Sequence, residues 1–158
     1  MKSESIDRLN SLLRDEVSAI ETYSKAETRA RSKHIREVLV FCQMQHQRRA
    51  QRLTERITTL GGKPSYNGHP WGALVKLIAS NVFSFDEKLA IAVLEEGEDV
   101  GLISYKEALK KVDSASVRMI ETDLLPTQIF TREMIHDLKE SLADSDLTSG
   151  SSGKFGEP

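Results

Sequence analysis

Hydrophobic side chains recur every three or four residues in four long segments of this chain, which is the period of an α-helix with one buried face. We predict helices over residues 5–30, 33–60, 84–111 and 115–143. The buried face of the first helix is expected to carry Leu9, Leu13, Glu16, Ile20 and Tyr23. No segment shows the alternating pattern of a strand, so the sequence predicts an all-α fold.

Local signals mark several helix ends. Gly61, Gly62 and Pro64 follow the second helix and are typical of a helix C-terminus. Ser32 is the predicted N-cap of the same helix, because its hydroxyl can accept a hydrogen bond from a free backbone N–H. Pro126 lies inside the fourth segment and predicts a kink or a local break, since proline has no backbone N–H.

The connection between the second and third helices is too long for a tight turn. It contains a short amphipathic segment, residues 71–82, and reaches Ser84 and Glu87, which have the spacing of a capping box. Four antiparallel helices with one long crossover predict a ferritin-like four-helix bundle. We expect this bundle over residues 1–143 and a flexible tail over residues 144–158, which contains the stretch SGSSG.

A polar side chain interrupts each predicted buried face near its midpoint. Burying a polar group without a partner costs about 1–3 kcal/mol, so four interruptions at one height need a reason. In an antiparallel bundle the midpoints lie at one level, and the interrupting residues should meet there: Glu16, His46, Glu98 and Gln128. Residues three apart share a helix face, which adds Gln43, Glu95 and Thr131.

Carboxylate oxygens and imidazole nitrogen are the ligand set of iron, manganese or zinc. The predicted metal ligands are Glu16, His46 and Glu98, with Glu95, Gln43 and Gln128 as alternates or hydrogen-bond partners. So few carboxylates balance one divalent ion better than two, and a metal-free hydrogen-bonded network is the alternative interpretation. In that case at least one central carboxylate is expected to be protonated or ion-paired.

Three stretches resemble bacterioferritin-type proteins. LNSLLRDEVSAIETY resembles their first helix, whose ligand glutamate matches Glu16. QMQHQRRAQRLTERITTLGGKP is similar to their second helix, where His46 matches the ligand histidine but Gln43 stands in the place of a ligand glutamate. EDVGLISYKEAL is similar to their third helix, with Glu98 at the position of the bridging glutamate.

With GHPWGAL and LLPTQ included, the order of motifs looks closer still to a group of small, uncharacterised bacterial ferritin-like proteins. The resemblance covers roughly residues 9–142. It implies a four-helix bundle that forms a homodimer or a larger homo-oligomer, is sometimes linked to stress or metal handling, and has no established reaction.

The fourth helix offers two alternatives for the inward pair. A literal Glu-x-x-His is present at Glu133 and His136, but the apolar face passes through Ile135, about 160° around the helix from Glu133. We therefore favour Gln128 and Thr131 as the inward pair. The site is then degenerate, because no histidine remains in the fourth helix.

Composition limits the partners but does not name a function. The chain has 158 residues, a net charge of −2 and one cysteine, Cys42, which predicts one domain without an internal disulfide. No long apolar run or signal sequence is seen, so a cytoplasmic protein that binds neither membrane nor nucleic acid is expected.

Four arginines in the second helix, at positions 48, 49, 52 and 56, are interpreted as a solvated face, although Arg49 or Ala50 must also contribute to the buried face. Two functions stay open. The first is metal binding or stress-linked metal handling through the central layer. The alternative is a non-enzymatic structural or interaction bundle that has lost the di-metal site.

Overall fold

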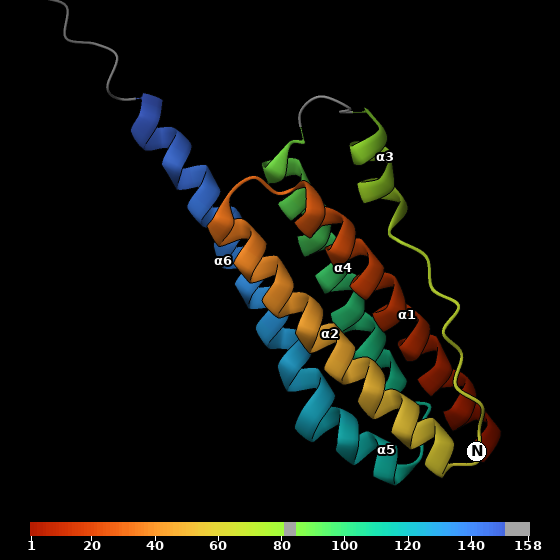
Figure 1. Cartoon of the computed structure of the whole chain (residues 1–158). Coiled ribbons are helices and arrows are strands. Elements are labelled where there is room, and N and C mark those ends of the chain that lie inside the picture. The colour runs from red at the N-terminus through yellow and green to blue at the C-terminus, as the bar shows by residue number, and fades with distance from the viewer. Residues whose placement is uncertain (81–84, 151–158) are drawn as a thin grey trace, which may run out of the picture.

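A computed structural model of the chain describes residues 1–80 and 85–150, and every regular element in these ranges is a helix. Four long helices lie side by side (Figure 1): α1 Lys2–Arg29, α2 Lys33–Thr59, α4 Glu87–Ala108 and α6 Leu125–Gly150. The shorter elements are α3 Gly72–Ser80, α5 Ser114–Met119 and the π-helical turn η1 Ile120–Leu124. The prediction of an all-α chain is confirmed.

The predicted start and end of α2 are confirmed. The side chain of Ser32 accepts a hydrogen bond from the backbone N–H of Ile35 at 3.3 Å. After the helix, Gly61 has a φ of 77°, a conformation that favours glycine, and Gly62 donates to the carbonyl of Ile57 at 2.9 Å.

The start of α4 differs from the prediction. Its N-cap is Asp86, whose side chain accepts from the backbone N–H of Leu89 at 3.1 Å. Ser84, the predicted cap, lies outside the described residues. Glu87 accepts instead from the backbone N–H groups of Arg31 and Ser32, so it joins α4 to the turn between α1 and α2.

The segment predicted as one helix over residues 115–143 is divided at Pro126. The N–H of Leu125 donates to the carbonyl of Ile120, five residues earlier, which makes η1 a π-helical turn. A wider turn makes room for the proline ring, which would otherwise clash with the preceding turn. Beyond it, α6 continues to Gly150, so residues 144–150 are helical and not the expected tail, while residues 151–158 lie outside the description.

The crossover between α2 and α3 runs along α1 (Figure 1). Side chains of α1 form hydrogen bonds with its backbone. Asn10 donates to the carbonyl of Lys63 at 3.1 Å, and Thr22 Oγ1 accepts from the N–H of Trp71 at 2.8 Å. The Trp71 ring then lies against Gly97 of α4, where an added Cβ would be 2.1 Å from the ring. The crossover is thus fixed to both α1 and α4.

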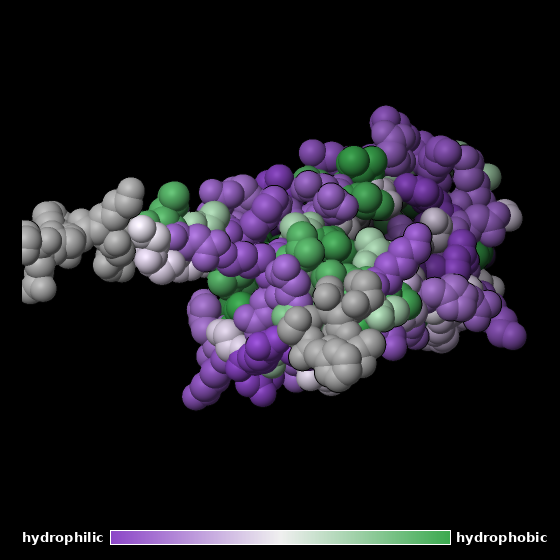
Figure 2. Space-filling model, turned by 90° about the horizontal axis from the view of Figure 1, so that it is seen from above, coloured by the Kyte–Doolittle hydropathy of each residue, from purple (hydrophilic) through white to green (hydrophobic). Residues whose placement is uncertain are grey.

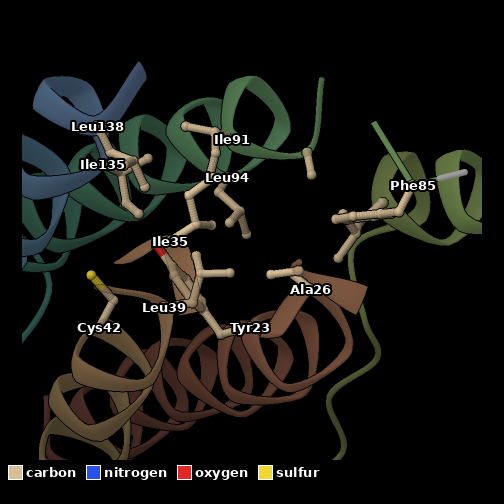
Figure 3. Close-up of a cluster of buried hydrophobic side chains, with 13 residues drawn as sticks. Tyr23, Ala26, Ile35, Leu39, Cys42, Phe85, Ile91, Leu94, Ile135 and Leu138 are labelled. Atoms are coloured by element: carbon tan, nitrogen blue, oxygen red, sulfur yellow. The ribbon is translucent and has the colours of Figure 1, made fainter. Parts of the chain in front are cut away.

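The apolar interior consists of two clusters. One is drawn in Figure 3 and brings side chains of α1, α2, α4 and α6 together, among them Tyr23, Leu39, Cys42 and Ile135. The other lies around the start of α1, the end of α2 and η1. From the end of the molecule that α3 covers, hydrophobic residues are visible between hydrophilic ones (Figure 2).

Burial raises the pKa of the Cys42 thiol to about 12, as expected of a cysteine that packs as a small hydrophobe.

Candidate functional site

A layer of buried polar residues lies between the two apolar clusters. Glu16 is 3% exposed, His46 3%, Glu98 0% and Gln128 1%, and they come together from the four long helices. Their positions near the helix midpoints predict that these four side chains lie together. Thr131 of α6 is also fully buried and joins them.

Both oxygens of the Glu16 carboxylate have hydrogen-bond partners. Oε1 accepts from Arg49 Nε at 2.9 Å and from the Tyr105 hydroxyl at 2.5 Å, and Oε2 lies 2.6 Å from His46 Nδ1. Burial alone would raise the pKa of Glu16, but the positive charges of Arg49 and His46 outweigh it and hold this pKa at about 2. Glu16 is therefore ionised at neutral pH.

Glu98 has a matching position on α4. Its Oε1 accepts from the Tyr23 hydroxyl at 2.5 Å and lies 2.9 Å from His46 Nε2. Its Oε2 accepts from Gln128 Nε2 at 2.8 Å and from Thr131 Oγ1 at 3.0 Å. Burial would raise the pKa of Glu98, yet His46 lowers it below its usual value.

His46 links the two carboxylates through its two ring nitrogens. Burial would lower the pKa of the imidazole, but Glu16 and Glu98 together raise it above its usual value. A protonated His46 can donate to both carboxylates. With Arg49, the layer then holds two positive and two negative charges.

Tyr23 and Tyr105 are not among the predicted site residues. Each donates its hydroxyl to the glutamate of the other helix, and burial raises the pKa of each well above its usual value. The sequence carries a signal for them, because Glu16 and Glu98 are each followed by tyrosine seven residues later. Residues seven apart lie on the same helix face, so the repeated Glu-x6-Tyr pattern marks the site twice.

The interpretation of Arg49 as part of a solvated face is wrong, since this residue is only 2% exposed. Of the two candidates for the buried face, Arg49 and Ala50, it is Arg49 that is buried. Besides its bond to Glu16, its Nη2 lies 2.9 Å from His46 Nδ1 and donates to Thr131 Oγ1 at 3.5 Å. The reason is electrostatic. The buried carboxylate of Glu16 on α1 accepts the hydrogen bond that the guanidinium would otherwise donate to water, and it also balances the positive charge. The ion pair between Arg49 and Glu16 also meets the expectation that a central carboxylate is ion-paired in a metal-free network.

Two predicted site residues lie outside the layer. Gln43 donates to the backbone carbonyl of Ile20 at 3.2 Å. Glu95 lies 2.6 Å from His136 Nδ1 and accepts from Lys139 Nζ at 2.5 Å. Gln43 and Glu95 each precede a residue of the layer by three positions, and three positions leave a side chain rotated by about 60°. Their hydrogen-bond partners lie on this side of the helix and not in the layer.

The choice between the two pairs of the fourth helix is settled in favour of Gln128 and Thr131, which face the layer. Glu133 is exposed, and the side chain of His136 is 44% exposed where it pairs with Glu95. The Glu-x-x-His pattern at these positions does not point into the layer.

A cavity of about 240 Å³ reaches the layer between α1 and α4. Glu16 and His46 are among its lining residues, together with Trp71, Gly97 and Gly101. An added Cβ at Gly101 would lie 2.7 Å from Gln128 Nε2, so the absence of side chains at the two glycines lets Trp71 and Gln128 take their places. The layer is therefore not sealed on this side.

The donor set of the layer does not fit a di-metal centre. All four carboxylate oxygens of Glu16 and Glu98 already have donors, and both nitrogens of His46 face carboxylates. Arg49 adds a fixed positive charge that metal ions would have to displace or oppose. Across residues 1–80 and 85–150, no three His, Cys, Asp or Glu side chains are arranged so that they could hold one metal ion.

Fold and site together define an all-helical protein with a buried, charge-balanced polar layer. A family model described as a domain of unknown function, DUF2383, matches residues 4–111, and the chain belongs to this family. The match includes Glu16, His46, Arg49 and Glu98 but ends before α6. No curated protein and no solved structure matches the chain. In the described part of the chain, no helix is both long and apolar enough to span a membrane.

Proposed function

We propose that the chain is a ferritin-like four-helix bundle that works without a bound metal, as a non-enzymatic structural and interaction protein. The topology supports the ferritin-like assignment. Helix α1 packs on α2, α4 packs on α6, and the long crossover between these pairs runs along α1 (Figure 1).

The buried guanidinium of Arg49 carries this proposal. Two carboxylates in an apolar interior need positive charge nearby, and a divalent metal ion is one source of it. Here Arg49 and His46 supply the charge from the chain itself and also fill the lone pairs through which Glu16 and Glu98 would bind a metal. A metal-independent layer explains why the site has a glutamine, Gln128, and an arginine where a di-metal centre would need acids and a second histidine.

Metal titration of the purified chain tests the proposal. Anaerobic iron(II), manganese(II) and zinc(II) are added to protein prepared without chelators, and binding is followed by calorimetry and metal analysis. We expect no stoichiometric binding that depends on Glu16. Glu16→Gln is compared with Glu133→Gln, which removes an exposed carboxylate of α6. One or two ions bound per chain, lost in Glu16→Gln and kept in Glu133→Gln, would overturn the proposal and favour metal handling.

The interaction surface that we assign to this function is a patch on α2 and α6, made of Val40, Phe41, Met44 and Phe130. These side chains are 36–50% exposed, and the rings of Phe41 and Phe130 are in edge contact with centroids 6.1 Å apart. A group of exposed apolar residues of this kind is typical of an interface. A hollow of about 330 Å³ adjoins three members of the patch, and its rim carries charges of both signs, Lys33, Arg36 and Glu37.

A second copy of the chain is the proposed partner. In a two-fold dimer the same patch meets itself, and a rim with both signs of charge can then pair positive with negative groups. Sedimentation analysis of Phe41→Asp tests this, with Leu89→Asp as the control, since Leu89 is 53% exposed on α4 outside the patch. We expect a dimer for the parent and for Leu89→Asp and a monomer for Phe41→Asp. A monomeric parent chain would refute the dimer and leave the metal test unaffected.

A further inference from the structure

A second cavity, of about 410 Å³, lies between α2 and the segment that starts with η1. Arg48, Arg49 and Arg52 line it from α2, and Asp123 and Thr127 line it from the other side. Arg49 is paired with Glu16 and Arg52 with Asp123, so the charge of Arg48 is the one that the walls leave unpaired. This cavity differs from the one between α1 and α4, which Arg49 does not line.

Arg49, one of the lining residues, has an unused donor. Its Nη1 is buried and has no hydrogen-bond partner among the described residues, whereas its Nε and Nη2 are bonded to Glu16 and Thr131. A buried charged donor without an acceptor is unfavourable, and native proteins rarely leave one. The cavity that Arg49 lines offers the space for an acceptor from outside the chain.

The two other arginines add charge at the entrance. Arg48 is exposed and forms no ion pair or hydrogen bond within residues 1–80 and 85–150, so its guanidinium is available to a ligand. Arg52 donates from Nε to Asp123 at 2.8 Å and from Nη1 to Glu55 at 3.2 Å, which fixes its position at the rim. Asp123 is thus the acid that competes with an incoming anion.

The opposite wall is shaped by η1, which contributes Asp123 and Leu124. Single π-helical turns within α-helices are frequent at functional sites. Here η1 places Asp123 and Leu124 opposite the arginines of α2. Pro126, in the turn that follows, is the reason for the wider turn of η1.

We propose that this cavity binds an anion that carries a phosphate group. Arginine guanidinium groups match the oxygens of phosphate, and charge-assisted hydrogen bonds of this kind are strong and directional. Arg48 and Arg52 stand one turn apart on α2, and the buried Arg49 follows Arg48 directly. A tetrahedral group has enough oxygens to accept from all three, while a planar carboxylate has only two oxygens to offer. The cavity is larger than one phosphate, which leaves room for a small organic group attached to it.

Calorimetric titration of the full chain with inorganic phosphate at constant ionic strength tests this site, with acetate as the carboxylate comparison. We expect saturable binding of one phosphate per chain and weaker binding of acetate. Arg48→Gln should weaken phosphate binding roughly tenfold, the effect of one charge-assisted hydrogen bond. Asp123→Asn should strengthen it, because the competing carboxylate is lost and Arg52 is released.

Arg29→Gln is the control, since it also removes one exposed arginine but lies at the end of α1, outside the cavity. It should change phosphate binding less than twofold, and circular dichroism should show that all variants fold. The proposal is refuted by the absence of saturable phosphate binding, by equal losses in Arg29→Gln and Arg48→Gln, or by weaker binding in Asp123→Asn. Tighter binding of acetate than of phosphate refutes the assignment to phosphate.

Discussion

Replacement of Arg49 by methionine is the most direct test of the charge-balanced layer. Methionine keeps much of the length of the side chain and removes the guanidinium. Glu16 then loses the donor at 2.9 Å on its Oε1 and keeps His46 as the only positive group beside it. The side chains of Arg49 and Glu16 are 2% and 4% exposed, so a water that enters from the cavity beside Glu16 replaces little of the lost charge interaction.

The expected loss of stability is large. Removal of one partner from a buried ion pair costs about 3–5 kcal/mol, because the other charge stays buried without compensation. The pKa of Glu16 gives a similar scale, since a fall from 4.5 to about 2 corresponds to about 3 kcal/mol at roughly 1.4 kcal/mol per pKa unit. A domain of this size has a total stability of about 5–15 kcal/mol, so Arg49→Met should lose about a fifth of it or more.

Urea denaturation at pH 7, followed by circular dichroism, measures this loss. The exposed neighbour gives the control: Arg48→Met should stay within about 0.5 kcal/mol of the parent. The double variant Glu16→Gln/Arg49→Met should be about 2 kcal/mol more stable than the sum of the two single effects predicts. The reason is that it leaves neither member of the ion pair buried without its partner.

Two results would contradict this reasoning. Arg49→Met within about 0.5 kcal/mol of the parent would mean that the guanidinium does not stabilise the layer. Strict additivity in the double variant would mean that Arg49 and Glu16 do not act on each other.

Three further predictions follow from the layer and its surroundings. Stability should be highest between about pH 4.5 and 6.5. The contribution of Glu16 is lost as the pH falls from 4.5 towards about 2, and that of His46 is lost as the pH rises above 6.5 through its raised folded-state pKa. Denaturation at several pH values should show both declines, and His46→Gln should lack the alkaline one. Gly97→Ala should cost about 1–3 kcal/mol and shift the fluorescence of Trp71, whose ring occupies the space of the new Cβ, while Gly72→Ala, with nothing within 4 Å, should not. A metal chelator should leave the midpoint of thermal unfolding unchanged, and a fall of several degrees would count against the metal-independent layer.

The helices follow from sequence because their signals are local. The spacing of apolar residues places α1, α2 and α4, and Gly61 ends α2 through its own backbone conformation. The role of Glu87 is different. Its side chain bonds to the backbone of Arg31, 56 residues away, and a pattern within one segment contains no information on such a contact.

The polar layer likewise contains residues that the sequence predicts and one that it does not. Glu16, His46, Glu98 and Gln128 are predictable because each breaks an apolar face near its midpoint, and helices of similar length bring midpoints together. The same pattern offers Arg49 or Ala50 for the next buried position of α2 and does not choose between them. The long stem of Arg49 can carry the charge outwards to water or inwards, and the inward direction depends on Glu16, which stands on another helix.

The layer also has an internal symmetry that bears on its function. Each glutamate lies within hydrogen-bond distance of one nitrogen of His46 and accepts from the tyrosine of the opposite helix, so α1 and α4 contribute equivalent halves. The remaining partners of the two glutamates differ. Arg49 bonds to Glu16 and has no counterpart beside Glu98 among the described residues. Glu98 is held instead by Gln128 and a hydroxyl, which are neutral donors. The positive charge of His46 is then needed mainly on the side of Glu98, and loss of the His46 proton should weaken the contact of α4 with α2 before that of α1 with α2.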